Sequence, residues 1–208
     1  MSLTVLITGF GPFPGAPFNP TTPLVRHLTR VHRPGLNDVR LVGHVFETSY
    51  AAVDRELPEL IARHRPEALL MFGVATRRKQ LSIEMRARNA LALLPDASGS
   101  VRACRAIAPG ASDLRLPAPH QKLLTAARSS GVPVQLSRDA GRYLCNYLCF
   151  RGACVVKSGG PKLAAFIHVP QLPRTSRQSW PSGRRFSPTD LARAGESILL
   201  ALAAEARR

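Results

Sequence analysis

Three long apolar runs constrain the fold of this chain more than any other feature. LTVLITGF at residues 3–10, EALLMFGVA at 67–75 and LAAFIHVP at 163–170 have the length of strands and are apolar at consecutive residues, not at every second one. Strands of this kind are buried on both faces, which is typical of parallel sheets covered by helices. We therefore expect an α/β fold, a three-layer α/β/α sandwich around a mainly parallel, twisted sheet.

The segments between these runs fit the same architecture. Further strands are expected over 38–46 and 132–136 and around Glu84, and helices from residue 19 or 21 to about 32, over 49–64, over 119–131, from about Arg142 onward and after the N-cap Ser187. A chain of 208 residues is long enough to bury one core. We expect a single peptidase-like domain over residues 1–208, with residues 173–186 forming a mobile loop.

The first residues of the chain carry no signal for export or membrane insertion. The apolar run in MSLTVLITGFG is only about six residues long and follows no basic segment, which is too short for a signal peptide or a membrane span. We therefore expect a soluble cytoplasmic protein with no membrane contact. In that compartment thiols stay reduced, so the four cysteines are not expected to form a disulfide framework.

The chain is strongly basic, with 29 Lys and Arg against 13 Asp and Glu and a net charge of +16. Such a charge can indicate a nucleic-acid partner, because Lys and Arg release counterions from phosphate chains. Here the basic residues are spread from Arg26 to Arg208, and aromatic residues do not alternate with them as in a base-stacking surface. We interpret them as a solvated surface and expect no nucleic-acid partner.

Three of the cysteines lie in one stretch, RDAGRYLCNYLCFRGAC, at residues 138–154. The DAG turn would place Cys145 in the first turn of a helix, where free backbone N–H groups and the helix dipole stabilise a thiolate. Cys149 and Cys154 would lie deeper in the helix as core residues. A small buried hydrophobe is the alternative for Cys145. Zinc is disfavoured, because no CxxC pair and no second Cys or His pair is nearby.

In a parallel sheet, sites form where the carboxyl ends of the strands converge. We place there the loop after Phe10, the loop after Gly73, the DAG turn and His168. At such an end His168 could take the proton of a thiol and return it to a leaving amine, although a structural histidine is the alternative. Such a base needs an acid to orient it. Glu84 lies in an apolar context that suits this role; the alternative is an ion pair with Arg78, Arg86 or Arg88.

Four segments resemble a known family when taken together and in order. They are TGFGPF at 8–13 followed by Asn19-Pro20, IEMRARN at 83–89, GRYLCNYL at 141–148 and FIHVPQLP at 166–173. The chain resembles, over roughly residues 4–173, the pyroglutamyl peptidase I family, also called pyrrolidone carboxyl peptidases, which are cysteine peptidases of an α/β fold.

The resemblance implies a reaction and a catalytic set. Cys145 is implied as the nucleophile, His168 as general base and then acid, and Glu84 as the acid that orients His168. Family members remove an N-terminal pyroglutamate through an acyl-enzyme, so the implied partner is a peptide with a blocked N-terminus. No metal or organic cofactor is expected.

The resemblance also implies a binding site for the lactam ring. Pyroglutamate is flat, uncharged and without a free amine, so it must be recognised by apolar faces and by hydrogen bonds to the lactam. Phe10 and Phe13 match the aromatic residues of the family that bind this ring. The remaining implied binding residues are Asn19, Thr48, Tyr143 and Leu144.

Two of the positions that depart from the family pattern bear on the reaction. The family commonly has an Arg ahead of Ile-Pro-Asp, where this chain reads Leu94-Pro95-Asp96, and a Gln after the strand-three Gly, where it has Val74. Two alternatives therefore stay open: a cysteine amidase of the same fold with altered specificity, and a weakly active homologue that binds blocked peptides. Bacterial members often form tetramers, so a homo-oligomer is also open.

Overall fold

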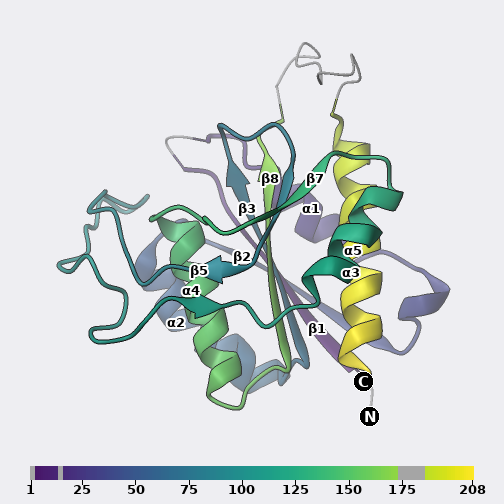
Figure 1. Cartoon of the computed structure of the whole chain (residues 1–208), viewed down its shortest axis with the longest axis horizontal. Helices are drawn as coiled ribbons and strands as arrows, with labels where there is room; N and C mark the ends of the chain where they lie inside the picture. The colour runs from purple at the N-terminus through teal and green to yellow at the C-terminus, as the bar shows by residue number, and fades with distance from the viewer. Residues whose placement is uncertain (1–2, 14–15, 173–185) are drawn as a thin grey trace.

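The structure, a computed structural model, describes residues 3–13, 16–172 and 186–208, and its elements form three layers around one six-stranded sheet (Figure 1). The expected loop at 173–186 lies outside the described residues, apart from Phe186. The strand order is β2-β1-β3-β8-β4-β7. The bounds are β1 Leu3–Phe10, β2 Val39–Phe46, β3 Ala68–Ala75, β4 Leu81–Glu84, β7 Val134–Ser137 and β8 Leu163–Pro170. All eight residues of β1 are buried, as its continuous apolar sequence predicts.

The sheet is mainly parallel, which confirms the expected fold class. β2, β1, β3 and β8 run in one direction, whereas β4 is antiparallel to β8 and parallel to β7. The expectation that the DAG turn lies at the carboxyl end of a strand in the parallel set is therefore wrong, because β7 runs the other way. Only residues 76–80 connect β3 to β4, and this connection is too short for the crossover that a parallel strand requires.

Helices cover both faces of the sheet (Figure 1). One apolar cluster joins the sheet to α1 Thr21–Leu28, α3 His120–Ser129 and α5 Pro188–Ala206. A second cluster joins the other face to α2 Tyr50–His64 and α4 Leu144–Lys157. The predicted start of α5 is confirmed, since Ser187 and Asp190 form a reciprocal capping box.

Two parts of the chain differ from the sequence prediction. α1 ends at Leu28 and not near residue 32; the Thr29 hydroxyl bonds the carbonyl oxygens of Val25 and Arg26, each at 3.1 Å, and competes with further helical turns. A small sheet of β5 (Arg86–Ala87) and β6 (Leu114–Arg115) contacts α4. Two-residue strands have no periodicity to detect. A 3₁₀ turn also spans Pro34–Leu36.

In the described part of the chain, no helix has the length and apolar character to cross a bilayer.

Candidate active site

Cys145 is the second residue of α4, in the helix turn that the DAG sequence predicts. Gly141 has a φ of +81° and its N–H donates to Oδ1 of Asp139 at 3.0 Å, which closes the turn ahead of the helix. Tyr143 then adopts the extended N-cap conformation. The first N–H groups of a helix have no intrahelical acceptor. The thiol of Cys145 therefore lies among free donors at the positive end of α4.

The sulfur of Cys145 occupies space left open by a missing side chain. A Cβ on Gly73 would lie 2.6 Å from Sγ of Cys145 and 2.7 Å from Cζ of Phe166. Gly73 on β3 pairs with His168 on β8, and the rings of Phe166 and His168 pack at 5.0 Å. The thiol thus lies over the β3–β8 pair at the level of His168. This packing role of Gly73 was not expected from the sequence, although a lone Gly inside a buried strand is a signal for it.

His168 is buried and has two partners, the carboxylate of Glu84 and the thiol of Cys145. Nδ1 lies 2.7 Å from Oε1 of Glu84. An ionised carboxylate can only accept, so Nδ1–H is the donor and Nε2 is left for other contacts. Burial alone would lower the pKa of His168, but the charge and hydrogen bond of Cys145, together with those of Glu84, raise it to about 9.

Glu84 ends β4 and is fully buried. The structure brings together the two hypotheses for this residue, because Oε1 accepts both from His168 and from Nη1 of Arg78, the latter at 2.5 Å. Burial would raise the pKa of Glu84, but hydrogen bonds from His168 and Ser137 and the charges of His168 and Arg78 hold it below its ordinary value. Glu84 is therefore an anion. Ser137 was not among the residues expected at the site.

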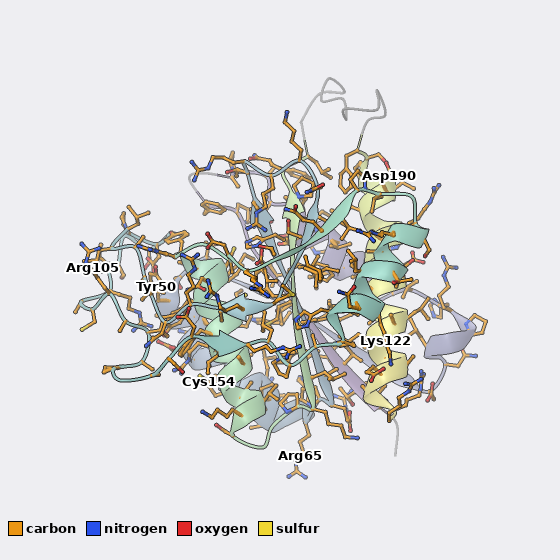
Figure 2. All side chains as sticks on the ribbon, viewed as in Figure 1. Tyr50, Arg65, Arg105, Lys122, Cys154 and Asp190 are labelled. Atoms are coloured by element: carbon orange, nitrogen blue, oxygen red, sulfur yellow. The ribbon has the colours of Figure 1, made fainter. Side chains whose placement is uncertain are left out.

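The other two α4 cysteines have the environments expected of packing residues. Cys149 is fully buried, and burial, with the negative charges of Glu84 and Cys145, raises its pKa well above the ordinary value. Burial also raises the pKa of Cys154, which is partly buried. Figure 2 shows Cys154 on the part of α4 remote from the carboxyl ends of β3 and β8. Cys104 is exposed, and the described cysteines form no disulfide.

The expected lactam-binding residues of the N-terminal loop lie around the carbonyl of Gly11. This oxygen accepts from Nδ2 of Asn19 at 2.9 Å and from Oγ1 of Thr48 at 3.0 Å. The side-chain oxygen Oδ1 of Asn19 in turn accepts from the backbone N–H and the hydroxyl of Thr21. The Asn19 amide thus serves to shape the loop. Phe10 is buried at the end of β1, whereas Phe13 is half-buried.

The remaining expected binding residues, Tyr143 and Leu144, precede Cys145 directly. Leu144 is buried, and the Tyr143 hydroxyl donates to the carbonyl of Pro95 at 2.9 Å. The backbone N–H of Ala97 donates to the carbonyl of Thr48 at 2.9 Å. The segment 95–97 therefore joins the Thr48 side of the site to the start of α4.

The two departures from the family pattern have different environments. Val74 is 8% exposed on β3, directly after Gly73. Leu94 is 54% exposed on the long connection from β5 to β6, and Figure 2 shows Arg105, on the same connection, far out beyond α2 and α4. Within the described residues, no group of three or more His, Cys, Asp and Glu side chains could hold a metal ion.

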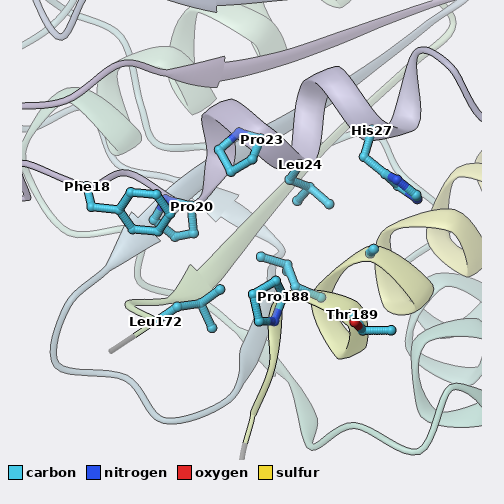
Figure 3. A pocket seen from close by; sticks show the side chains of 10 residues that line it. Phe18, Pro20, Pro23, Leu24, His27, Leu172, Pro188 and Thr189 are labelled. Atoms are coloured by element: carbon cyan, nitrogen blue, oxygen red, sulfur yellow. The ribbon is translucent and has the colours of Figure 1, made fainter. Parts of the chain in front are cut away.

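A separate cavity of about 340 Å³ lies on the other face of the sheet, between the starts of α1 and α5 (Figure 3). Its walls are mostly apolar and include Phe18, Pro20, Leu24, Leu172 and Pro188. None of the three expected catalytic residues lines it, so it is distinct from the site around Cys145.

The resemblance inferred from the four segments is confirmed by comparison with known proteins. The sequence profile of the family described as pyroglutamyl peptidase matches residues 3–197. The chain belongs to this family. The pyrrolidone-carboxylate peptidase of Pyrococcus furiosus is 32% identical over 174 residues, which are 82% of each chain. That of Thermococcus litoralis is 33% identical over 174 residues, 81% of this chain and 77% of its own.

Solved structures of the pyroglutamyl peptidase family have the same fold. A mutant pyrrolidone carboxyl peptidase from Pyrococcus furiosus is similar with a TM-score of 0.86 at 27% identity, over 98% of this chain and 99% of that one. Pyroglutamyl peptidase I of Bacillus amyloliquefaciens is similar with a TM-score of 0.84 at 26% identity, over 97% of both chains.

Proposed function

We propose that this protein is a cysteine exopeptidase that removes N-terminal pyroglutamate from peptides through an acyl-enzyme on Cys145. The observation that carries the proposal is the pair of contacts of His168, to a carboxylate on one side and to a thiol on the other, in a member of the pyroglutamyl peptidase family. A nucleophile, a base and an orienting acid in this order can perform acyl transfer.

In the first half of the reaction, the Cys145 thiolate attacks the carbonyl carbon that joins pyroglutamate to the next residue. The carbonyl electrons move to oxygen, and the backbone N–H of Cys145 would stabilise that oxyanion. As the tetrahedral species collapses, the C–N bond breaks and the imidazolium of His168 gives its proton to the leaving amine. The raised pKa of His168 supports this step, because the ring holds that proton at neutral pH.

In the second half, His168 is neutral and acts as a base. It takes a proton from a water molecule, which attacks the thioester carbon, and the C–S bond breaks. Free pyroglutamate leaves, and the thiolate and the imidazolium are restored. Glu84 stays ionised throughout and keeps Nδ1–H as its donor, so that Nε2 faces the reaction.

We place the lactam ring between the N-terminal loop and the start of α4. Phe13, Tyr143 and Leu144 would supply apolar faces, and Phe10 would support the wall from within the core. The polar edge of the lactam ring would lie near the hydroxyl of Thr48, which bonds the carbonyl of Gly11. Asn19 bonds the same carbonyl and would hold the N-terminal loop in place. Substrate recognition would then need no cofactor.

A fluorogenic pyroglutamyl amide tests the proposal. Turnover should be measurable in the wild-type protein and lost in Cys145→Ser and in His168→Ala. The alternative of altered specificity predicts no turnover of this amide but rapid alkylation of Cys145 near neutral pH, which is assigned by peptide mass spectrometry. A Cys145 thiol as slow to react as Cys149 would contradict both. Val74 supports the alternative of altered specificity, because an apolar side chain replaces the amide that the family has beside Gly73.

The cytoplasmic location and a homo-oligomeric state stay predictions, which cell fractionation and sedimentation would test.

A further inference from the structure

Arg78 contacts the candidate active site at two separate points. Its Nη1 donates to Oε1 of Glu84 at 2.5 Å, and its Nη2 donates to the main-chain carbonyl of Asp139. Glu84 is the acid that bonds His168, and Asp139 begins the DAG turn that precedes the Cys145 helix. One guanidinium therefore connects the acid to the turn before the nucleophile.

The contact to Glu84 fixes which oxygen the histidine meets. Oε1 of Glu84 receives both Arg78 and His168, and the carboxylate is fully buried. A buried carboxylate with too few donors is costly and can rotate to find others. A charged donor on Oε1 opposes that rotation and keeps the carboxylate in position to accept Nδ1–H of His168.

The contact to Asp139 holds the main chain of the DAG turn. The Asp139 carboxylate is itself used, since Oδ1 accepts from Gly141 and Oδ2 lies 3.4 Å from Nη2 of Arg88. Arg78 takes the main-chain oxygen. The planar fork of an arginine can satisfy two acceptors in different directions, which a lysine ammonium does with far less geometric control.

On this basis, and resting on the function proposed above, we propose that Arg78 is a positioning residue of the active site, which aligns Glu84 with His168 and the DAG turn with Cys145 at the same time. It touches no reacting atom. Its removal should slow catalysis through misaligned groups and leave the lactam-binding residues unchanged.

The test compares Arg78→Ala with Arg77→Ala, its exposed neighbour on the same loop. Arg78→Ala should lower kcat about 10- to 100-fold with KM changed less than about threefold, and Arg77→Ala should stay within about twofold of wild type. Arg78→Lys should recover only part of kcat, because an ammonium does not reproduce the two-sided fork. Millimolar guanidinium added to Arg78→Ala should restore part of the rate.

A second measurement is independent of the substrate. The rate at which iodoacetamide alkylates Cys145 near neutral pH, followed by peptide mass spectrometry, should fall in Arg78→Ala and not in Arg77→Ala. An unchanged alkylation rate in Arg78→Ala, a loss expressed only in KM, or an equal loss in Arg77→Ala would each overturn the role of Arg78. If Arg78→Ala does not fold, full kcat in Arg78→Lys would overturn it instead. Failure of the proposed function is a different result, namely no turnover by the wild-type protein.

Discussion

Cys145 and Cys149 lie one turn apart on the same helix, yet their surroundings differ in every respect that controls a thiol. Cys145 is in the first turn, partly accessible and in contact with His168. Cys149 is fully buried, and its pKa is raised well above the ordinary value. The negative charge of Glu84 raises the pKa of Cys149, whereas Cys145 contacts the His168 ring that bonds Glu84.

Position relative to the sheet, not residue type, separates a candidate nucleophile from a packing residue. A thiolate at Cys145 gains free N–H donors and a cation. A thiolate at Cys149 would lose its hydration and gain nothing in exchange. Substitutions at Cys145, Glu84 and Gly73 should each change that difference, with decreasing effect on the rate.

The largest effect should come from removing each thiol in turn. Cys145→Ala should lower kcat for a pyroglutamyl amide by at least about 10,000-fold, because no other group can form the acyl-enzyme. Cys149→Ala should leave kcat within about twofold and lower the free energy of unfolding by about 1 kcal/mol, because it only removes packing. Steady-state kinetics and urea denaturation measure these quantities. Comparable losses of kcat in both variants would refute the division.

A smaller effect, with a pH signature, should follow from Glu84→Gln. The rate should fall about 1,000-fold, as expected when a triad acid no longer orients its histidine. The leaving amine needs protonated His168, so kcat/KM of the wild-type protein should decline above a pH of about 9, the pKa of that ring. The negative charge of Glu84 raises that pKa, so the decline in Glu84→Gln should begin at lower pH, by about one unit.

The Glu84→Gln variant should also make the alkylation rates of Cys145 and Cys149 more alike. Glu84 also raises the pKa of Cys149, so Glu84→Gln should lower that pKa while it weakens the His168 contact of Cys145. Alkylation of both residues against pH, read by mass spectrometry, measures the two changes. If kcat/KM declines above the same pH in Glu84→Gln as in the wild-type protein, Glu84 is not the partner that sets the protonation of His168.

The smallest effect should come from filling the space under the sulfur. Gly73→Ala should lower kcat about 10- to 100-fold, because its Cβ would displace Sγ of Cys145 or the rigid ring of Phe166. Gly152→Ala is the matched control on α4. Its Cβ would lie 2.7 Å from the flexible end of Met71, so stability should fall while kcat does not. Equal rates in Gly73→Ala and wild type would show that the sulfur is not confined by β3.

Most of the fold could be predicted from local sequence because its signals are local. The apolar runs at 3–10, 67–75 and 163–170 form the central strands β1, β3 and β8, and Ser187 begins α5. The directions of β4 and β7 were harder to predict, because a short strand takes its direction from the length of its connection and from the strands it pairs with. β5 and β6 are two residues each, below any detectable period.

The members of the candidate site could be proposed from the sequence, whereas their contacts could not. Cys145, His168 and Glu84 were identified from a turn signal, a strand end and a family resemblance. The sequence left Glu84 with two separate hypotheses, an orienting acid or the partner of an arginine, and the structure combines them on Oε1. Residues 78, 84 and 168 meet only when β4 pairs with β8, which no local pattern encodes.

By itself, the sequence determined that buried strands alternate with helices and that one cysteine follows a turn at a helix start, because hydrophobic periodicity, turn residues and caps act over a few neighbouring residues. The tertiary structure decided which cysteine faces a histidine, which carboxylate that histidine meets and that Gly73 leaves room for the sulfur. These outcomes depend on burial and on charges brought together from distant parts of the chain, and such forces are set only when the sheet and the helices have packed.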